Sequence, residues 1–512
     1  MKIISAPEAA NLVGSNWRLV TSGFGSCGHP DALTIALRKR FVETGQPENL
    51  KLFFAAGSGD KSGRGLDQLA LPGLVDQAIG GFWGLCPKLS EMAENGEIEA
   101  HNWPQGVISK LFSKIASKSP GVISHIGIDT FVDPVHDGGV IDNSGRKSLV
   151  ERVTLKGKDY LFYPSQYINC AFLRGTAADE YGNILFCEET SYMDALAQAS
   201  AAKNSGGIVV VQVKRLIDNN LEPCKVKIPG FLVDYVVVAE EHEHPQTYGT
   251  AFNKAYTTKQ LVDDTPIVTN LPLCKKIIVE RAALELLKYP AANVNLGIGV
   301  PASIGEQAHC WGWSNFTLTV ESGLVGGIPD KDLSFGASKN PLAIIEQSAL
   351  FDFYDGGGLD VAFLGFGEMD QSCNVNVSKL GNKRPGSGGF INISQTAKNI
   401  VFCGTFTTDG LLVEMSNGHL SILNEGNIEK FVSCVAHRTF SSSLAEASKQ
   451  SVMLITERAV FSIINCTLVL IEIAPGIKIE SIVKKIPFQF EISTDLKFMA
   501  CPVFSSELSK VS

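Results

Sequence analysis

The sequence lacks the short motifs that define several common sites. Its twelve cysteines are never closer than Cys170 and Cys187, so there is no C-x-x-C pair and no zinc ribbon or thioredoxin-type redox motif. No G-x-x-x-x-G-K-[ST], G-x-S-x-G or H-E-x-x-H occurs, which excludes a P-loop, a hydrolase nucleophile elbow and a zincin helix. We expect no metal site, and we interpret the scattered cysteines as small buried residues without disulfides.

The sequence also lacks a basic surplus and a long apolar run. Its 44 basic and 53 acidic residues give a net charge of −9, which argues against a general nucleic-acid binder. The longest uncharged stretch, Tyr289–Gly305, is broken by Pro290 and Pro301, so no membrane span is expected. Met1–Leu12 carries Glu8 and no apolar run, unlike a secretory signal. These features predict a cytoplasmic protein without a membrane partner.

Short β-branched runs alternate with amphipathic stretches and glycine-rich turns along the chain. This order predicts an α/β fold with mostly parallel sheets. The predicted strands include Lys51–Ala56, Gly207–Val213, Leu232–Ala239, Asn293–Gly297 and Val361–Leu364. The predicted helices include Pro30–Phe41, Met193–Lys203, Lys275–Leu287 and Ser303–Ala308.

A polar stretch divides the chain into two halves. We predict an N-terminal domain over 1–245, a linker over 246–273 and a C-terminal domain over 274–512. The sequence therefore predicts two similar open-sheet α/β domains joined by a linker, with ligands at the carboxyl ends of strands or between the domains.

The two halves contain similar segments. Gly23–Pro30 resembles Asn295–Pro301, and each follows a predicted strand and precedes a predicted helix. Arg174–Asn183 resembles Gly367–Asn374 in the same way. These pairs indicate that the halves are distant copies.

One glycine turn formally matches a dinucleotide-binding motif. Gly23–Gly28 reads G-x-G-x-x-G, but Glu43, at the spacing where the acidic residue is required, belongs to the first helical segment, just past Phe41, and not to the end of a strand. The motif alone is weak evidence. A tight turn whose backbone N–H groups approach some other ligand is the better interpretation.

Glu321 is the leading candidate for catalysis. It follows the strand-like run Asn315–Val320 and opens Ser322–Pro329, which contains Gly323, Gly326 and Gly327. A carboxylate on such a turn has no bulky neighbours and suits a nucleophile. An ordinary surface or capping glutamate is an equally good reading of this local pattern.

Further glycine clusters surround this candidate in the sequence. Those around Gly297 and Gly299, Gly357, and Gly388 and Gly389 would suit a narrow slot for a long ligand. Gln105, in a Pro-Gln-Gly turn, could donate its amide to a developing oxyanion, although such turns are usually only turns.

These residues resemble the family I CoA-transferases of the acetate/propionate type, over roughly residues 10 to 480. The segments that carry the resemblance are Ala55–Asp60, Gly63–Gly65, Ile79–Gly84, Pro104–Ile108, Ala202–Gly207, Pro229–Val236, Asn295–Gly299, Thr319–Gly327, Phe351–Gly358 and Gly386–Ser394. The long collinear series is specific for the family and much less so for the acyl group.

The resemblance implies roles for particular residues. Glu321 matches the catalytic glutamate of the family, Gln105 its oxyanion-side amide, and Gly388 with Gly389 the backbone N–H partner. Gly297, Gly299, Gly323, Gly326, Gly357 and Gly389 are assigned to substrate binding.

The resemblance also implies a reaction. It predicts CoA transfer between short-chain carboxylates by a ping-pong mechanism through a glutamyl-CoA thioester. Coenzyme A is then a substrate, no cofactor is needed, and the partners are acyl-CoA and carboxylates. A homo-oligomer is expected. Because Glu321 and Gln105 fall in different halves, we expect the site where the halves meet.

The sequence departs from the family pattern in places. Cys373 stands where glycine is expected, and it would be strained if that position needs a positive φ. The tail after about Phe488 is not matched. An acyl-CoA hydrolase, a non-catalytic CoA-binding protein and a nicotinamide dehydrogenase remain alternatives, in that order.

Overall fold

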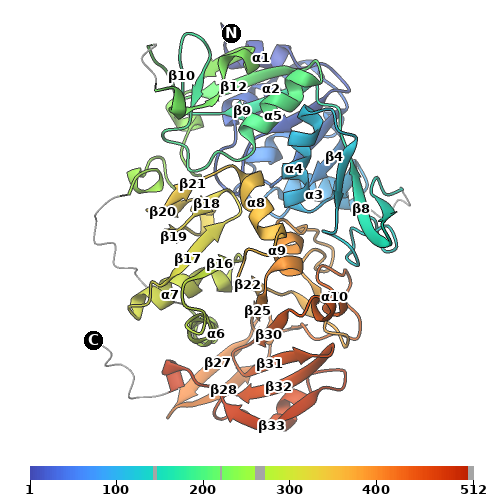
Figure 1. The fold of residues 1–512 in the computed structure, drawn as a ribbon, viewed down its shortest axis with the longest axis vertical. Helices are drawn as coiled ribbons and strands as arrows, with labels where there is room; N and C mark the ends of the chain where they lie inside the picture. The colour runs from blue at the N-terminus through green and yellow to red at the C-terminus, as the bar shows by residue number, and fades with distance from the viewer. Residues whose placement is uncertain (142–146, 219–221, 260–270, 505–512) are drawn as a thin grey trace. The chain divides into compact units, whose positions relative to one another are not determined.

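The computed structural model describes residues 1–141, 147–218, 222–259 and 271–504 (Figure 1). The chain forms two compact units that are interleaved along the sequence. Unit 1 contains Met1–Gln260, Val320–Asp352 and Gly381–Asn392, and unit 2 contains Leu261–Thr319, Phe353–Leu380 and Ile393–Ser512.

Unit 1 is built on an eight-stranded parallel sheet in the order β1-β15-β12-β9-β2-β3-β4-β5 (Figure 1). Its strands are β1 (Lys2–Ile3), β2 (Arg18–Thr21), β3 (Leu50–Phe54), β4 (Val75–Gly80), β5 (Glu99–Asn102), β9 (Cys170–Arg174), β12 (Ile208–Val213) and β15 (Tyr235–Val238). The strand order reverses at β2, between β3 and β9, which is the kind of position where open α/β sheets bind ligands.

Helices cover both faces of this sheet. Successive strand residues point to opposite sides, so Leu19 joins one apolar core and Val20 the other. The core that contains Val20 includes helices α4 (Gln105–Ala116) and α5 (Ala195–Asn204). The core that contains Leu19 includes α1 (Ala6–Asn11), α2 (Asp31–Thr44) and α3 (Pro87–Glu94).

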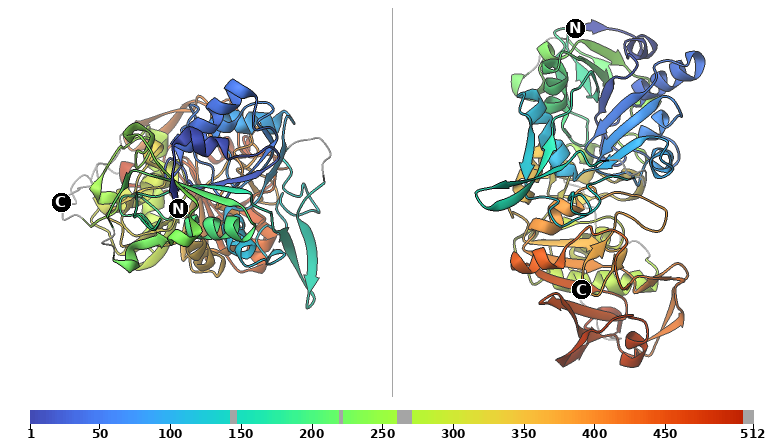
Figure 2. Two further views of the ribbon diagram at one scale, coloured as in Figure 1. Left: turned by 90° about the horizontal axis from the view of Figure 1, so that it is seen from above. Right: turned by 90° about the vertical axis from the view of Figure 1, so that its right-hand side faces the viewer.

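Smaller elements complete unit 1. The strands β6 (Gly121–Ser124), β7 (Glu151–Leu155) and β8 (Lys158–Pro164) form an antiparallel sheet that stands out from the unit (Figures 1 and 2). A second small sheet contains β10 (Ala177–Ala178), β11 (Ile184–Leu185), β13 (Arg215–Leu216) and β14 (Val226–Ile228). Later in the chain follow β18 (Leu324–Val325), β19 (Ile328–Pro329), β20 (Ser338–Lys339), β21 (Ala343–Ile344) and the start of α8 (Gln347–Asp355).

Unit 2 contains a second open sheet, in which β17-β16-β22-β25-β30-β31-β32-β33 are neighbours in that order. The first five are parallel, and β31 then pairs antiparallel with both β30 and β32. The strands are β16 (Ala292–Leu296), β17 (Phe316–Val320), β22 (Val361–Gly365), β25 (Asn399–Cys403), β30 (Ser451–Ile455), β31 (Ala459–Ile464), β32 (Thr467–Ile473) and β33 (Glu491–Phe498). Its helices are α6 (Leu273–Leu286), α7 (Ile304–Cys310), α9 (Phe390–Thr396), α10 (Ser442–Ala447) and α11 (Ile479–Val483), and the hairpin β27 (Leu412–Ser416) and β28 (His419–Asn424) lies beside the core.

The α/β class and the two open sheets are confirmed. Every strand and helix singled out above forms, with bounds that differ by at most three residues, because the apolar periodicity sets each element's type and the turns set its ends. The tail after Phe488, which the resemblance did not reach, supplies β33, which pairs in parallel with β32.

The domain boundaries proposed from the sequence, at residues 245 and 273, stay a prediction. The compact units follow another plan, since two segments of the later sequence belong to unit 1. Of the predicted linker, 260–270 lies outside the described residues. The earlier part of the predicted linker packs into unit 1, where Tyr248 and Tyr256 are buried.

A repeated turn shows that the sequence similarity has a structural basis. Asp179 accepts hydrogen bonds from the backbone and side-chain amides of Asn183, at 2.8 Å each. Asp370 accepts the same two bonds from Asn374, at 2.9 and 3.3 Å. The residue before each asparagine has a positive φ, 83° at Gly182 and 59° at Cys373.

Candidate active site

Glu321 lies on a tight turn directly after β17. Gly323 N–H donates to Val320 O at 3.0 Å, which closes the turn around Glu321 and Ser322. Ser322 is fully buried, and its hydroxyl donates to Gly336 O while its carbonyl accepts from Ser191 Oγ. The backbone around Glu321 is therefore fixed on both sides, and the side chain is half-buried.

The glycine in this turn is required by both conformation and space. Gly323 has a φ of 105°, and a methyl group there would lie 2.1 Å from Ile345 O. Ile345 also holds the turn in place through its backbone, because its N–H donates to Gly323 O at 2.9 Å. The predicted role of Gly323 in binding a ligand is not needed to explain the residue, because the turn itself requires glycine.

Gln105 and Glu321 each contact one of two adjacent glycines, Gly388 and Gly389. Gln105 N–H donates to Gly388 O at 3.0 Å, and its Oε1 lies 3.6 Å from where a methyl group on Gly388 would be. A methyl group on Gly389 would lie 3.1 Å from Glu321 Cγ. All four residues belong to unit 1. Unit 1 alone thus brings the two candidate side chains together, and the expected meeting of the two halves is not required for this.

The two glycines differ in what their backbone N–H groups do. Gly388 N–H donates to Gly81 O at 2.7 Å, so it is engaged within the protein. Within the described ranges, Gly389 N–H makes no backbone hydrogen bond. Of the two glycines that the resemblance gives as the backbone N–H partner, Gly389, whose added methyl group would lie 3.1 Å from Glu321 Cγ, is therefore the better candidate for the oxyanion donor.

The segment that carries these glycines is anchored at the carboxyl ends of β4 and β5. Asn102 is the last residue of β5, and its Nδ2 donates to Gly80 O and Gly81 O at 2.8 and 2.6 Å. Its Oδ1 accepts from Ser387 N–H at 2.9 Å. Asn102 therefore fixes the glycine segment to the sheet edge at which α4 begins.

Gln105 is buried, and a polar network fixes its side-chain amide. Its Nε2 donates to Gln347 Oε1 at 3.1 Å, and Gln347 Nε2 donates to Asp194 Oδ2 at 2.6 Å. The other oxygen of Asp194 accepts from Ser109 Oγ. Burial raises the pKa of the Asp194 carboxyl to about 6, although both hydrogen bonds act to lower it.

Gln347 and Asp194 are the residues that sequence reasoning missed. Neither stands in a recognisable motif, since Gln347 follows a plain Ile-Ile-Glu run and Asp194 opens an alanine-rich helix. Only the positions of the folded elements, α4, α5 and α8, bring them to Gln105.

The remaining predicted glycines lie elsewhere. Gly326 is in unit 1, where its φ is 73° and a methyl group would lie 2.5 Å from Leu342 Cγ. Gly297 and Gly299 follow β16 in unit 2, with Gly297 N–H donating to Phe363 O at 2.8 Å. Gly357 has a φ of 83° just after α8, a conformation that explains its glycine without a ligand. Their binding roles stay predictions.

The first glycine turn does not form a ligand cradle. A methyl group on Gly25 would lie 2.6 Å from Phe335 O. The N–H groups of Gly25, Ser26 and Cys27 donate to carbonyl oxygens of the protein, at 3.1, 3.1 and 2.9 Å. The interpretation of Gly23–Gly28 as a turn that offers N–H groups to a ligand is therefore wrong, because protein atoms already occupy that space.

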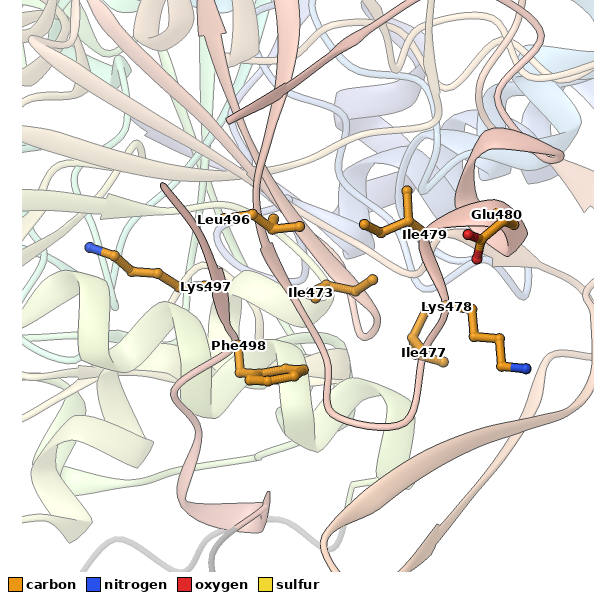
Figure 3. A pocket seen from close by; sticks show the side chains of 8 residues that line it. All are labelled: Ile473, Ile477, Lys478, Ile479, Glu480, Leu496, Lys497 and Phe498. Carbon is orange, nitrogen blue, oxygen red and sulfur yellow. The ribbon is translucent and has the colours of Figure 1, made fainter. Parts of the chain in front are cut away.

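A cavity of about 340 Å³ lies in unit 2 between β32, β33 and α11 (Figure 3). Its lining is apolar apart from Lys478, Glu480 and Lys497, and it contains none of the predicted site residues. Among the described residues, no cluster of three or more metal-binding side chains occurs, and no helix is long and apolar enough to cross a membrane.

The chain is similar to known proteins over almost its whole length. A family profile described as "Coenzyme A transferase" matches residues 3–239. The chain is 41% identical to the acetate CoA-transferase YdiF of Escherichia coli K12, over 97% of this chain and 94% of that protein. It is also 41% identical to the caffeate CoA-transferase of Acetobacterium woodii, over 99% and 98%.

A solved structure extends the similarity to three dimensions. The acyl-CoA transferase YdiF of E. coli O157:H7, solved as a thioester complex with CoA, superposes with a TM-score of 0.93. The match has 39% sequence identity and covers 99% of this chain and 96% of that one.

Proposed function

This chain belongs to the coenzyme A transferase family, and we propose that it moves CoA between short-chain carboxylic acids with Glu321 as the nucleophile. It is an enzyme of the CoA-transferase class. The proposal therefore concerns which carboxylic acids it uses and which residues carry out the transfer. The observation that carries the assignment of residues is the contact of both Glu321 and Gln105 with the glycine pair Gly388 and Gly389.

The proposed reaction has two covalent stages. The Glu321 carboxylate attacks the donor acyl-CoA carbonyl, and the C–S bond breaks. CoA thiolate is expelled, and an acyl–glutamyl anhydride is formed. The thiolate then attacks the glutamyl carbonyl, which releases the free acid and leaves a glutamyl-CoA thioester. An acceptor carboxylate runs the same steps in reverse, so thioester energy is conserved. Coenzyme A serves as substrate in this scheme, and no cofactor is needed.

Each stage passes through a tetrahedral intermediate with a negatively charged oxygen. We assign the Gln105 side-chain amide and the Gly389 N–H to the stabilisation of this oxygen, because Gln105 contacts Gly388 and Glu321 contacts the neighbouring Gly389. Preorganised donors of this kind are worth about 2.7–4 kcal/mol of barrier each. Gly388 then serves to position Gln105 through its carbonyl oxygen.

The proposed nucleophile needs help from its surroundings. A carboxylate is a weak nucleophile in water, and an anhydride exposed to water would hydrolyse. Glu321 is half-buried, with Ser322 and Gly323 fully enclosed behind it. Binding energy from the remote CoA moiety supplies the rest of the activation.

Kinetics with varied donor and acceptor test the transfer proposal. We expect parallel double-reciprocal plots at several acceptor concentrations, because one site serves both acids in turn. Intersecting plots would indicate direct transfer in a ternary complex. Release of CoA without an added carboxylate would indicate an acyl-CoA hydrolase that uses the same glutamate.

The acids are proposed from the relatives. The names of the two relatives specify acetate and caffeate, which differ greatly in size. We propose short-chain acids such as acetate, propionate and butyrate. A screen of acyl-CoA donors against carboxylate acceptors, with caffeate included, tests this choice, and a preference for caffeate would contradict it.

We further propose a cytoplasmic enzyme that forms a homo-oligomer. The acidic composition and the absence of an apolar span among the described helices support the location. Cell fractionation and sedimentation of the purified protein test these two statements, and a monomer would contradict the second.

A further inference from the structure

The polar network behind Gln105 closes into a ring. Gln105 and Ser109 lie four residues apart on α4, so their side chains lie on the same face. Gln105 donates to Gln347, Gln347 donates to Asp194, and Ser109 donates to Asp194. The ring therefore begins and ends on one helix.

All the members of this ring are buried. Gln105 and Asp194 are 2% exposed, Gln347 is 1% exposed and Ser109 is fully enclosed. Backbone contacts also hold Gln347, whose N–H donates to Met193 O at 3.0 Å. A buried polar network of this kind is costly unless each member is satisfied, and when satisfied it is rigid.

The chemistry of the ring members determines the direction of each hydrogen bond. An ionised carboxylate can only accept, so Asp194 requires the NH2 end of Gln347 to face it. The oxygen of Gln347 must then face Gln105, which requires the NH2 end of Gln105 in turn. One N–H of Gln105 is used for Gln347, and the amide is held in one of its two orientations.

We propose that Asp194 is a positioning residue for the reaction, which acts through Gln347 to orient the Gln105 amide toward the site. The proposal rests on the proposed function, in which the second N–H of Gln105 stabilises the oxyanion. Without Asp194, the Gln347 amide has no fixed partner and both amides can turn over. Gln105 Oε1, which lies beside Gly388, and Nε2, which donates to Gln347, could then exchange places, and the second N–H would no longer be held in one direction.

The test uses kcat, KM and folding of the full-length enzyme. Asp194→Ala should lower kcat by at least about tenfold, and by no more than the 10²–10³-fold expected for loss of the Gln105 donor itself. The KM for acyl-CoA should change less than threefold, because the amide serves the developing charge more than the ground state. Asp194→Asn should recover most of kcat, since its oxygen can still accept from Gln347 and its NH2 can donate to Ser109.

Asp67→Ala is the matched control. Asp67 is a fully buried carboxylate of unit 1 that also accepts two hydrogen bonds, from Lys88 N–H and Leu89 N–H at 3.1 Å each. Burial raises its pKa to about 6, as for Asp194. This variant should lose stability but keep its kcat, which separates positioning from a general effect of losing a buried carboxylate.

A double-mutant cycle identifies the route of the effect. In a Gln105→Ala background, Asp194→Ala should lower kcat by less than twofold, because the group that it positions is gone. If Asp194→Ala does not fold, Gln347→Met breaks the same relay at similar volume and should give the same loss.

The outcomes separate this proposal from the proposed function. A kcat unchanged in both Asp194→Ala and Gln347→Met, with Gln105→Ala impaired, overturns the positioning role alone. An equal loss of kcat with and without Gln105 does the same. An unimpaired Gln105→Ala enzyme overturns the oxyanion assignment and the positioning role with it.

Discussion

At the scale of single residues, the account depends most on Gln105. Gln105→Ala should lower the rate of transfer by roughly 10²–10³-fold, the range for one lost oxyanion donor. CoA affinity should change little, because the ground state does not use the amide. Single-turnover kinetics with isotopically labelled acyl-CoA, together with CoA binding by calorimetry, measure both quantities. An unchanged rate would return the Pro-Gln-Gly turn to its ordinary structural interpretation.

Cys373 allows a test of backbone strain. It is fully buried with a φ of 59°, a conformation that costs a side-chain-bearing residue about 1–2 kcal/mol. Cys373→Gly relieves the strain and Cys373→Ala keeps it, and both remove the sulfur. The glycine variant should therefore be more stable than the alanine variant by about 1 kcal/mol in denaturant unfolding.

The equivalent turn in unit 1 provides the control for this comparison. Gly182 already has glycine at a φ of 83°, so Gly182→Ala should lose stability. An alanine at 373 as stable as glycine would show that the turn relaxes, and that the departure from the family pattern is free of strain.

Asp194 also predicts a pH dependence of stability. Burial raises its pKa from the ordinary value of 3.8 to about 6 in the folded protein, so the folded state binds the proton more tightly than the unfolded chain. Its contribution to stability is therefore present at low pH and is lost as pH rises through about 6. The whole shift from 3.8 to about 6 corresponds to about 3 kcal/mol, of which about half is already lost below pH 5. Asp194→Asn does not titrate, so its stability relative to wild type should rise by about 1–2 kcal/mol between pH 5 and pH 8.

The measurement is denaturant unfolding of both proteins at several pH values. Working with the difference between variant and wild type removes the contributions of groups that do not interact with Asp194, such as His29, whose pKa burial lowers to about 3. Glu346 does not cancel in this way, because burial and the Asp194 charge together raise its pKa to about 8. A difference that is flat across this pH range would show that the Asp194 carboxyl titrates normally in the fold.

At the scale of elements, the turn after β17 determines whether Glu321 is presented. Gly323→Ala places a methyl group 2.1 Å from Ile345 O at a φ of 105°, so the turn must move. We expect the free energy of unfolding to fall by more than about 1 kcal/mol and the transfer activity to fall by at least about tenfold. Thermal unfolding and transfer rates on the same preparation measure the two effects.

Gly45→Ala separates backbone strain from the movement of this turn. Gly45 ends α2 with a φ of 71°, and a methyl group there would meet nothing within 4 Å. This variant should lose about 1 kcal/mol from strain alone, less than Gly323→Ala, while its activity is retained. Equal activity in the Gly45 and Gly323 variants would show that the turn does not need its glycine to present Glu321.

The helices and strands also differ from the site residues in how well the sequence predicts them. Elements such as Ile208–Val213 and Asp31–Thr44 were predictable because their apolar periodicity and glycine ends are local signals. Glu321 and Gln105 were reached through local turns and a family resemblance. Asp194 and Gln347 were not, because a buried hydrogen-bond network depends on how elements distant in sequence pack.

At the scale of the whole molecule, the interleaving of the two units is the main feature that sequence order did not predict. The segments Val320–Asp352 and Gly381–Asn392 come late in the chain but belong to unit 1. A division of the sequence into halves assigns Glu321 and Gln105 to different domains. Long-range packing places them together instead, since non-local contacts leave no periodic signal in the sequence.

The central claim is that Glu321 carries CoA during transfer. Incubation with acyl-CoA and no acceptor should release the free acid and increase the intact mass of the protein by that of one CoA less one water, and borohydride reduction should convert Glu321 to its alcohol. Peptide mapping should then find the change at Glu321, and Glu321→Ala should show neither the adduct nor transfer while staying folded. An adduct on one of the twelve cysteines, or transfer that persists in Glu321→Ala, would contradict the account.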